Sequence, residues 1–132
     1  MQTFIVHWDM ERNAMLLDRQ RLGKQRLECA QIAKACLGIT NGWKNHPNVI
    51  RWIGYEPYLI NEYMRAILLE WERRGYKNDK MREEFLALSE MVEGRHIVKP
   101  FWVNDVIIEH RNLLLSKNFK FYRDKFYPIL NN

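Results

Sequence analysis

The chain has few cysteines and no long apolar run, and each shortage excludes a class of protein. Only two cysteines occur in 132 residues. Their spacing of seven residues would put the Cα atoms of Cys29 and Cys36 about 10 Å apart along a helix, too far for a disulfide. No histidine stands at ligand spacing from them, so a zinc site is excluded and both are interpreted as small buried hydrophobes. No apolar run approaches the length that spans a bilayer.

The first nine residues, from Met1 to Asp9, lack the basic region and the long apolar stretch of a signal peptide. We therefore expect a cytoplasmic protein, in the host cytoplasm if the protein is viral. An apolar content of 47% and an aromatic content of 13% exclude general disorder. The length is typical of one domain, and there are no repeats, low-complexity tracts or linkers, so we expect a single domain over residues 1–132.

Positive charge exceeds negative charge, and the excess is uneven along the chain. The formal net charge is +5, from 21 Lys and Arg against 16 Asp and Glu. Cations dominate residues 19–26 and 111–125, whereas residues 79–93 are mainly acidic. This distribution predicts a basic side and an opposite side. A basic protein favours an acidic partner, with nucleic acid first and an anionic membrane a distant second.

The pattern of apolar residues and helix boundary signals predicts an all-α protein with about five or six helices after a short extended segment at residues 3–7. Asp9 is a good N-cap, Pro47 and Pro57 are typical of a first helical turn, and Asn78 can begin another helix. Gly23 interrupts the first helix and marks a kink or a close approach by a ligand. The expected helices cover 10–37, 47–54, 57–74, 78–93, 103–117 and 119–126.

The most informative segment is the basic run that ends in an acid, from Asp18 to Glu28. On a helix, Arg21, Lys24 and Glu28 share one face. Such a face would hold a phosphate backbone with its cations and move protons with its carboxylate. By itself the run is also explained by a solvated helix face, because an exposed i,i+4 pair such as Lys24 and Glu28 contributes only about 0.2–0.5 kcal/mol.

A second candidate is the loop Gly42-Trp43-Lys44-Asn45-His46-Pro47, which precedes a predicted helix. Helix N-termini bind phosphate through free backbone N–H groups, and Trp or His can stack on a base. The alternative is an ordinary helix N-terminus in which Trp43 anchors the loop in the core.

Two later segments complete the set. His110 and Arg111 lie in a predicted helix, although a single helical histidine is more often a surface or core residue than a catalyst. Basic and aromatic residues interleave from Lys117 to Arg123, which suits backbone contact and stacking. The alternative for this segment is a C-terminal helix that packs its aromatic rings on the core.

In their order and spacing, these segments resemble the pyrimidine-dimer DNA glycosylase family, often called the ultraviolet-repair endonuclease V family. The resemblance covers most of the chain and rests on residues 22–28, 42–47 and 74–76, and on His110-Arg111 followed by Phe121-Tyr122-Arg123. The Lys-Asn-His-Pro loop and the Arg-Gly-Tyr after a long helix are the most specific parts. The match is closer to a cellular branch of the family than to the phage enzyme.

The resemblance implies an all-helical, single-domain enzyme that uses no metal or other cofactor and acts on damaged double-stranded DNA. Such enzymes bend the duplex, flip a base, cut the glycosidic bond at the 5′ base of a cyclobutane dimer and cleave the strand by β-elimination. The chain's own α-amino group attacks the sugar C1′ to form an imine. A glutamate in the first long helix moves the protons, and Glu28 matches it.

One departure concerns the nucleophile. The phage-type enzyme exposes a small second residue when its initiator methionine is removed, but here Gln2 follows Met1, and a bulky second residue normally prevents that removal. The amine of Met1, an amine exposed by trimming and the amine of Lys24 are the candidates, and a fourth possibility is that lyase chemistry is absent. An α-amine has a pKa of about 7.7–8.0, so part of it is neutral at cellular pH.

The sequence therefore predicts a monomeric DNA glycosylase and AP lyase with Glu28 and Met1 as catalytic residues. Three alternatives stay open: a non-catalytic DNA-binding module, a glycosylase for another modified base, and a helical protein that binds an acidic protein partner. The expected DNA contacts are Arg19, Arg21, Lys24, Arg26, Trp43, Lys44, Asn45, His46, His110, Arg111, Lys117 and Arg123.

Overall fold

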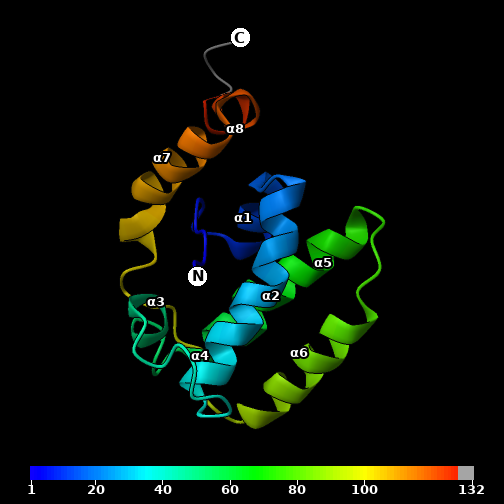
Figure 1. Ribbon diagram of the computed structural model, residues 1–132, viewed down its shortest axis with the longest axis vertical. Coiled ribbons are helices and arrows are strands. Elements are labelled where there is room, and N and C mark those ends of the chain that lie inside the picture. Colours follow the sequence, from blue (N-terminus) through cyan, green and yellow to red (C-terminus); the bar gives the residue numbers. More distant parts are fainter. Residues whose placement is uncertain (128–132) are drawn as a thin grey trace.

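The computed structural model describes residues 1–127, and within that range the chain is helical with no strand (Figure 1). The all-α class is therefore confirmed. The single-domain prediction for 1–132 includes five residues outside the described part. The elements are α1 (Met10–Leu16), α2 (Arg19–Cys36), α3 (Pro47–Ile50), α4 (Glu56–Tyr58), the π-helix η1 (Leu59–Met64), α5 (Arg65–Arg73), α6 (Asp79–Met91), the 3-10 turn η2 (Asn104–Val106), α7 (Ile107–Lys117) and α8 (Phe119–Phe126).

Several helix ends lie where the sequence signals predict them. The side chain of Asp9 accepts a hydrogen bond from the backbone N–H of Glu11 and caps α1. Pro47 is the first residue of α3, and α2 is followed by Gly38 in a left-handed conformation with φ of 76°. Asn78 precedes α6, but its side chain makes no cap bond.

The predicted helix over 10–37 is two helices, which is a correction to the sequence analysis. Leu17 and Asp18 have extended backbones that separate α1 from α2. Leu17 is fully buried, and the N–H of Asp18 donates to the hydroxyl of Tyr122, more than 100 residues along the chain. The break therefore depends on a tertiary contact with α8. As a result, residues 1–127 contain seven helical runs where about five or six were expected.

The helix predicted from Pro57 begins one residue earlier, at Glu56, and α4, η1 and α5 form one continuous helical run. The middle of this run is π-helical, from Leu59 to Met64. π-helical turns inside α-helices are rare and are often found at functional sites. Here the π-helical turn carries Tyr63, which is fully buried and whose hydroxyl reaches the N-terminal segment.

The Arg-Gly-Tyr sequence, residues 74–76, connects the end of α5 to the end of α1. The guanidinium of Arg74 donates to the carbonyl of Leu17 at 2.7 Å, which binds the end of α1, and its Nε donates to Glu70. Gly75 has φ of 96°, a region that favours glycine, and lets the chain turn away from α5. The ring of Tyr76 then lies 4.3 Å from that of Trp71. This motif is thus explained by packing beside α2.

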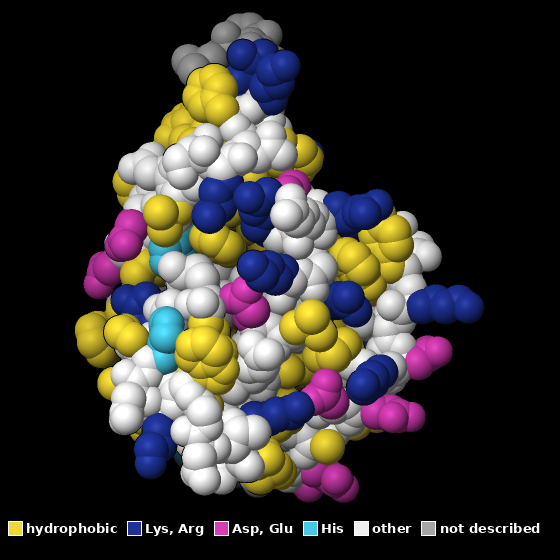
Figure 2. All heavy atoms as spheres, viewed as in Figure 1, with side chains coloured by type: hydrophobic (Ala, Val, Ile, Leu, Met, Phe, Trp, Pro, Cys, Tyr) yellow, Lys and Arg dark blue, Asp and Glu magenta, His cyan; other side chains and the backbone are white. Residues whose placement is uncertain are grey.

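Charge is unevenly distributed over the surface, and the predicted division into a basic and an opposite side stays a prediction. Figure 2 shows several Lys and Arg side chains over the centre of one face, and many of the Asp and Glu side chains in this view lie at the lower right, among further Lys and Arg, where Figure 1 places α6. On α6, Glu84 pairs with Lys34 of α2. No helix within residues 1–127 has both the length and the apolar character needed to cross a membrane.

Candidate active site

The N-terminal segment, residues 1–6, is extended and largely buried, and it has no partner strand in the described chain. Buried backbone N–H and C=O groups need hydrogen-bond partners, and here side chains supply them. Asn13 of α1 accepts from the N–H of Val6 at 2.6 Å and donates to the carbonyl of Phe4 at 3.1 Å. On α7, Arg111 donates to the carbonyl of Val6. The first residues of the chain are thereby held in one position.

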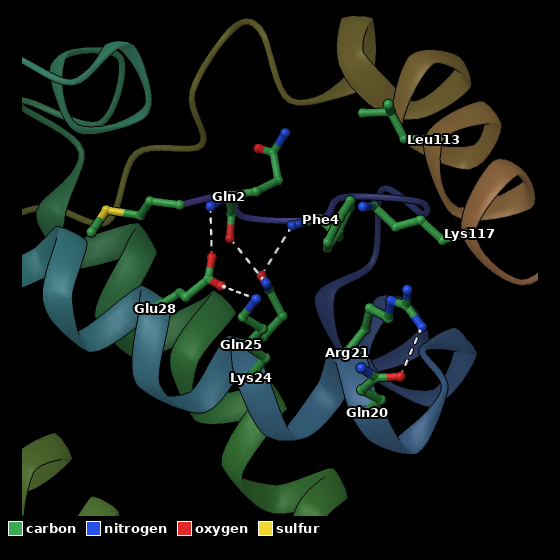
Figure 3. A pocket seen from close by; sticks show the side chains of 10 residues that line it. Gln2, Phe4, Gln20, Arg21, Lys24, Gln25, Glu28, Leu113 and Lys117 are labelled. Carbon is green, nitrogen blue, oxygen red and sulfur yellow. Dashed lines mark hydrogen bonds and ion pairs between the residues drawn. The ribbon is translucent and has the colours of Figure 1, made fainter.

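The edge of this segment that faces α2 is bound by two side chains one helical turn apart. Glu28 accepts from the N–H of Gln2 at 2.6 Å. Gln25 donates to the carbonyl of Gln2 at 2.9 Å and accepts from the N–H of Phe4 at 3.0 Å. Figure 3 shows both side chains rising from α2 toward the segment. Because alternate residues of an extended chain present their polar groups to the same edge, one face of α2 binds Gln2 and Phe4 together.

Glu28 therefore lies against the beginning of the chain. Its second carboxylate oxygen is 3.9 Å from the Nζ of Lys24, and its side chain is only 14% exposed. The carbonyl of Met1 accepts from the side-chain amide of Asn48 at 2.6 Å, so Met1 is bound from the α3 side as well. The carboxylate of Glu28 and the nitrogen of Gln2 are thus neighbours, at the end of the chain where an imine mechanism needs an acid.

These residues line a cavity of about 340 Å³ at the surface, within the size range of ligand sites. Its walls come from the N-terminal segment, from α2 and from α7 (Figure 3). Lys117, from the second basic segment, contributes a cation to the wall opposite α2. The complete lining is Met1, Gln2, Phe4, Gln20, Arg21, Lys24, Gln25, Glu28, Leu113 and Lys117.

Two of the four cations of the basic run face this cavity. Lys24 is 72% exposed and carries its ammonium group beside Glu28, where a phosphate of a bound strand can reach it. Arg21 is more enclosed, at 18% exposed, and donates to the carboxylate of Asp18 at 3.2 Å. The pairing with Asp18 holds the Arg21 guanidinium in place at the wall.

The other two cations lie on a different face of α2. Arg26 stacks over Trp71, 4.2 Å from the ring centroid, and donates to the side chain of Asn78 at 3.0 Å. Arg19 lies 5.9 Å from the ring centroid of Tyr76. Burial lowers the pKa of Arg26, and its Nε is buried without a hydrogen-bond partner. This packing gives Arg26 a structural role in place of the expected phosphate contact.

The glycine at position 23 is explained by packing on the same face of α2. It lies inside α2, and a Cβ at this position would be 3.0 Å from the ring of Trp71. The group that approaches Gly23 closely is therefore a side chain of the protein, and the alternative of a ligand at this point is not needed. Trp71 in turn supports both Arg26 and Tyr76.

The loop before α3 is exposed, so the alternative in which Trp43 anchors it in the core is wrong. Trp43 is 57% exposed and has φ of 69°, which is rare for a bulky residue. Its ring meets the ring of His46 edge to face at 5.8 Å. His46 is the N-cap of α3 and accepts from the N–H of Asn48. Lys44 and Asn45 are exposed, as a contact with DNA requires.

His110 is not placed for contact with DNA, and this corrects the sequence analysis. It is 1% exposed, and its Nδ1 accepts from the N–H of Ile5 at 2.9 Å. Burial lowers its pKa to about 4, so the ring stays neutral and keeps this acceptor nitrogen. Arg111 is half-buried between Val6 and the ring of Phe126, whereas Lys117 and Arg123 are exposed.

The C-terminal segment matches both interpretations given for it. Tyr122 and Phe126 are buried and pack α8 on the core, while Lys120 and Lys125 of the same helix remain exposed. The hydroxyl of Tyr122 also bonds to Asp18, which connects α8 to the start of α2. Tyr122 and Phe126 are therefore structural, whereas Phe119 and the two lysines are available at the surface.

Sequence reasoning missed three residues that position the site: Gln25, Asn48 and Tyr63. All three bind the N-terminal segment or each other. The only signal for Gln25 was its place between Lys24 and Glu28 on the basic helix. Nothing in the sequence pairs Asn48 or Tyr63 with residues 1–4, because those contacts span 47 and 59 positions.

Within residues 1–127 no group of three or more His, Cys, Asp and Glu side chains is arranged to hold a metal ion. Cys29 is fully buried and Cys36 partly buried, and burial raises the pKa of both thiols, that of Cys36 to about 12. Both cysteines therefore serve as apolar packing groups.

Comparison with known families gives one match, to the family model described as pyrimidine dimer DNA glycosylase, over residues 1–84. Comparison with curated proteins and with solved structures gives no match. The matched residues include the N-terminal segment and α2, which supply most of the cavity lining, and also the loop before α3 and the Arg-Gly-Tyr sequence, whereas Leu113 and Lys117 lie outside the match. Because the match covers more than half of the chain and includes Glu28 and both ends of its contacts, the chain belongs to the pyrimidine dimer DNA glycosylase family.

Proposed function

We propose that this protein excises damaged pyrimidines, in the form of cyclobutane dimers, from double-stranded DNA and then nicks the strand as an AP lyase. Membership of the family supports the glycosylase part. The observation that carries the lyase part is the contact of 2.6 Å between the carboxylate of Glu28 and the nitrogen of residue 2, inside a cavity walled by cations.

The reaction begins when an amine at the start of the chain attacks the sugar C1′ of a flipped nucleotide. The glycosidic bond breaks, the base leaves with the bonding electrons and takes up a proton, and the sugar ring opens to an iminium ion. Removal of a C2′ proton then expels the 3′ phosphate by β-elimination. Glu28 stabilises the iminium cation and carries the protons, because it lies beside the nitrogen concerned.

Three nitrogens qualify as the nucleophile: the amine of Met1, the amine of Gln2 in a chain that has lost Met1, and the Nζ of Lys24. The Nζ of Lys24 is 3.9 Å from the Glu28 carboxylate, and the nitrogen of residue 2 is 2.6 Å from it. In a chain that keeps Met1, the nitrogen of Gln2 is a backbone amide, and the proposed nucleophile is the amine of Met1, one residue before it. In a chain that has lost Met1, the amine of Gln2 itself touches Glu28.

The proposed DNA surface consists of the cavity rim, the exposed loop before α3 and the cations of α7 and α8. Lys24 and Arg21 hold the strand beside the flipped nucleotide, and Trp43 offers a ring for stacking. The proposed contacts are Arg21, Lys24, Trp43, Lys44, Asn45, Arg111, Lys117 and Arg123; His46 supports the ring of Trp43. We expect a monomer in the cytoplasm.

Borohydride trapping tests the lyase part. Purified protein is mixed with a duplex that contains an abasic site, reduced, and digested for mass mapping of the adduct. We expect a covalent adduct on Met1 or on Gln2, and the intact mass of the protein determines which residue begins the chain. A pure protein that neither forms an adduct nor cleaves the strand is not an AP lyase.

The lesion is tested separately, with a panel of duplexes that carry a cyclobutane dimer, another modified pyrimidine or no damage. We expect release of base only from the dimer. Release from a different base, with adduct formation intact, would keep the lyase mechanism and replace the substrate. Binding without turnover on every duplex would favour the non-catalytic DNA-binding alternative.

A further inference from the structure

Gln25 makes contacts that neither the basic run nor the proposed chemistry accounts for. It is a polar side chain that is 1% exposed, on the same helix as Lys24 and Glu28. Both ends of its amide are used, the nitrogen by the carbonyl of Gln2 and the oxygen by the N–H of Phe4. This is the bonding pattern that a neighbouring strand would offer to the segment.

A second buried group fixes the orientation of that amide. The hydroxyl of Tyr63 lies next to the amide oxygen of Gln25 and 3.0 Å from the carbonyl of Phe4. Burial raises the pKa of Tyr63, so the hydroxyl keeps its proton and acts as a donor. A donor at this point requires an acceptor, so the oxygen of Gln25 faces Tyr63 and the nitrogen faces Gln2.

The consequence concerns the atom that meets Glu28. The N–H and C=O of Gln2 are bound on the same edge of the segment. Glu28 binds the N–H, and Gln25, three residues earlier on the same helix, binds the C=O (Figure 3). A slip of the segment by one residue would move the nitrogen of residue 2 off the carboxylate. The other edge, held by His110 at Ile5, does not bind residue 2.

We infer that Gln25, oriented by Tyr63, is a positioning residue that holds the start of the chain in register so that its reacting amine meets Glu28. The inference rests on the proposed function, because it assigns Gln25 a part in imine formation. Gln25 does not touch the substrate in this role. Its effect is on the geometry of the attack, and a displacement of about 1 Å can reduce a rate by about 100-fold.

The test compares Gln25→Leu with Gln31→Leu, which makes the same change at an exposed position of the same helix. Amide hydrogen exchange at Phe4 and Ile5 measures whether the segment is released, since these N–H groups are bound by Gln25 and by His110. Single-turnover borohydride trapping on an abasic duplex measures imine formation, and duplex binding is measured at the same salt concentration.

For Gln25→Leu we expect faster exchange at Phe4, unchanged exchange at Ile5, trapping slowed at least tenfold and unchanged duplex affinity. Gln31→Leu should match the wild type in all four. Trapping at the wild-type rate while Phe4 is released would overturn the inference. So would a slower rate that is accompanied by lost protection at Ile5 or weaker binding, because the role would then be structural only.

Two further variants keep the test decisive if Gln25→Leu does not fold. Tyr63→Phe removes one hydroxyl, and the carbonyl of Phe4 keeps Asn13 as its donor. Gln25→Glu keeps an acceptor for Phe4 and removes the donor to Gln2. We expect both to slow trapping without weakening binding, and wild-type trapping in both would overturn the inference.

A failure of the proposed function would look different. If the wild type forms no adduct at all, the lyase proposal fails, and the exchange measurements alone decide the role of Gln25. Faster amide exchange at Phe4 in Gln25→Leu, with protection kept at Ile5, then supports the role of Gln25 in holding the start of the chain. Unchanged exchange at Phe4 overturns it.

Discussion

Two faces of α2 carry the same kinds of residue and have different tasks. On one face, Lys24 and Arg21 line a cavity together with Glu28, and Lys24 is open to solvent. On the other face, Arg26 and Arg19 lie over the rings of Trp71 and Tyr76. The cation of Lys24 is available to a phosphate, whereas that of Arg26 is committed to an aromatic ring and to Asn78. The difference teaches that charge in a sequence predicts a partner only where packing leaves the charge exposed.

The largest expected effect is on the cavity face, at Glu28. We expect Glu28→Gln to lower the rate of strand cleavage by about 10³-fold, because general acid–base catalysis contributes roughly 10²–10⁴-fold. Duplex affinity should stay within about twofold of the wild type, since removing a negative charge does not weaken contacts with phosphate. Single-turnover cleavage and a binding titration measure the two. Cleavage at an undiminished rate would remove the chemical distinction between the faces.

The next largest effect is on the pH dependence of stability. We expect it to arise at His110 of α7, outside both faces of α2. The pKa of this histidine is lowered to about 4 from an ordinary value of 6.5. Above pH 6.5 the ring is neutral in both the folded and the unfolded protein, so its contribution to stability is complete. As the pH falls from 6.5 to 4 the unfolded chain takes up a proton that the folded chain excludes, and about 3 kcal/mol of stability is lost.

Urea unfolding at pH 7.5, 6.0 and 5.0 measures this loss. His110→Asn provides the control, because an amide oxygen accepts a hydrogen bond and does not titrate in this range. The slope of stability against pH should be smaller in that variant. An equal slope in both proteins would assign the pH dependence to other groups.

The same substitution, to Gln, should have different effects on the two faces of α2. Arg26→Gln should lower the free energy of unfolding by about 1–2 kcal/mol, because it removes a stacked and hydrogen-bonded guanidinium. Lys24→Gln should leave stability nearly unchanged and reduce the salt slope of DNA binding by about one. Chemical denaturation and affinity titrations over a series of salt concentrations measure both. If the two variants exchange these properties, the assignment of the faces is wrong.

The smallest expected effect is at Gly23. Alanine is normally favoured over glycine in a helix by about 1 kcal/mol, but here the new Cβ would meet the ring of Trp71 at 3.0 Å. We expect Gly23→Ala alone to change stability by less than about 0.5 kcal/mol, since the two contributions offset each other. In a Trp71→Ala background the same substitution should stabilise by about 1 kcal/mol. Equal effects in both backgrounds would show that Trp71 does not constrain Gly23.

Most of the helices could be predicted, because their ends are signalled by neighbouring residues. Asp9 and Pro47 begin helices, and the run from Glu56 to Arg73 differs from the prediction by one residue at each end. The break at Leu17 and Asp18 was not predicted. Asp18 is the N-cap of α2 and has a residue type that favours this position, but its side chain makes no cap bond, and the contact of its N–H with Tyr122 has no local signal in the sequence.

The candidate site was predicted in part. Glu28, Met1, Lys24, Arg21 and Lys117, which were each singled out from the sequence, line one cavity. Their proposed roles in catalysis and DNA binding stay predictions. His110 was assigned to DNA and is buried, because the motif records that a histidine is present and not whether it is exposed.

The sequence by itself determined the helical class, the basic character and the family to which the chain belongs, because helix signals, charge and motif spacing are local properties. Only the tertiary structure decided which cations remain exposed and which nitrogen meets Glu28. The exposure of the cations depends on how α2 is rotated against Trp71. The nitrogen that meets Glu28 depends on side chains of α1, α2, η1 and α7 that bind the extended N-terminal segment. Both are set by contacts between residues far apart in the chain, and for such contacts a single sequence carries no periodic signal.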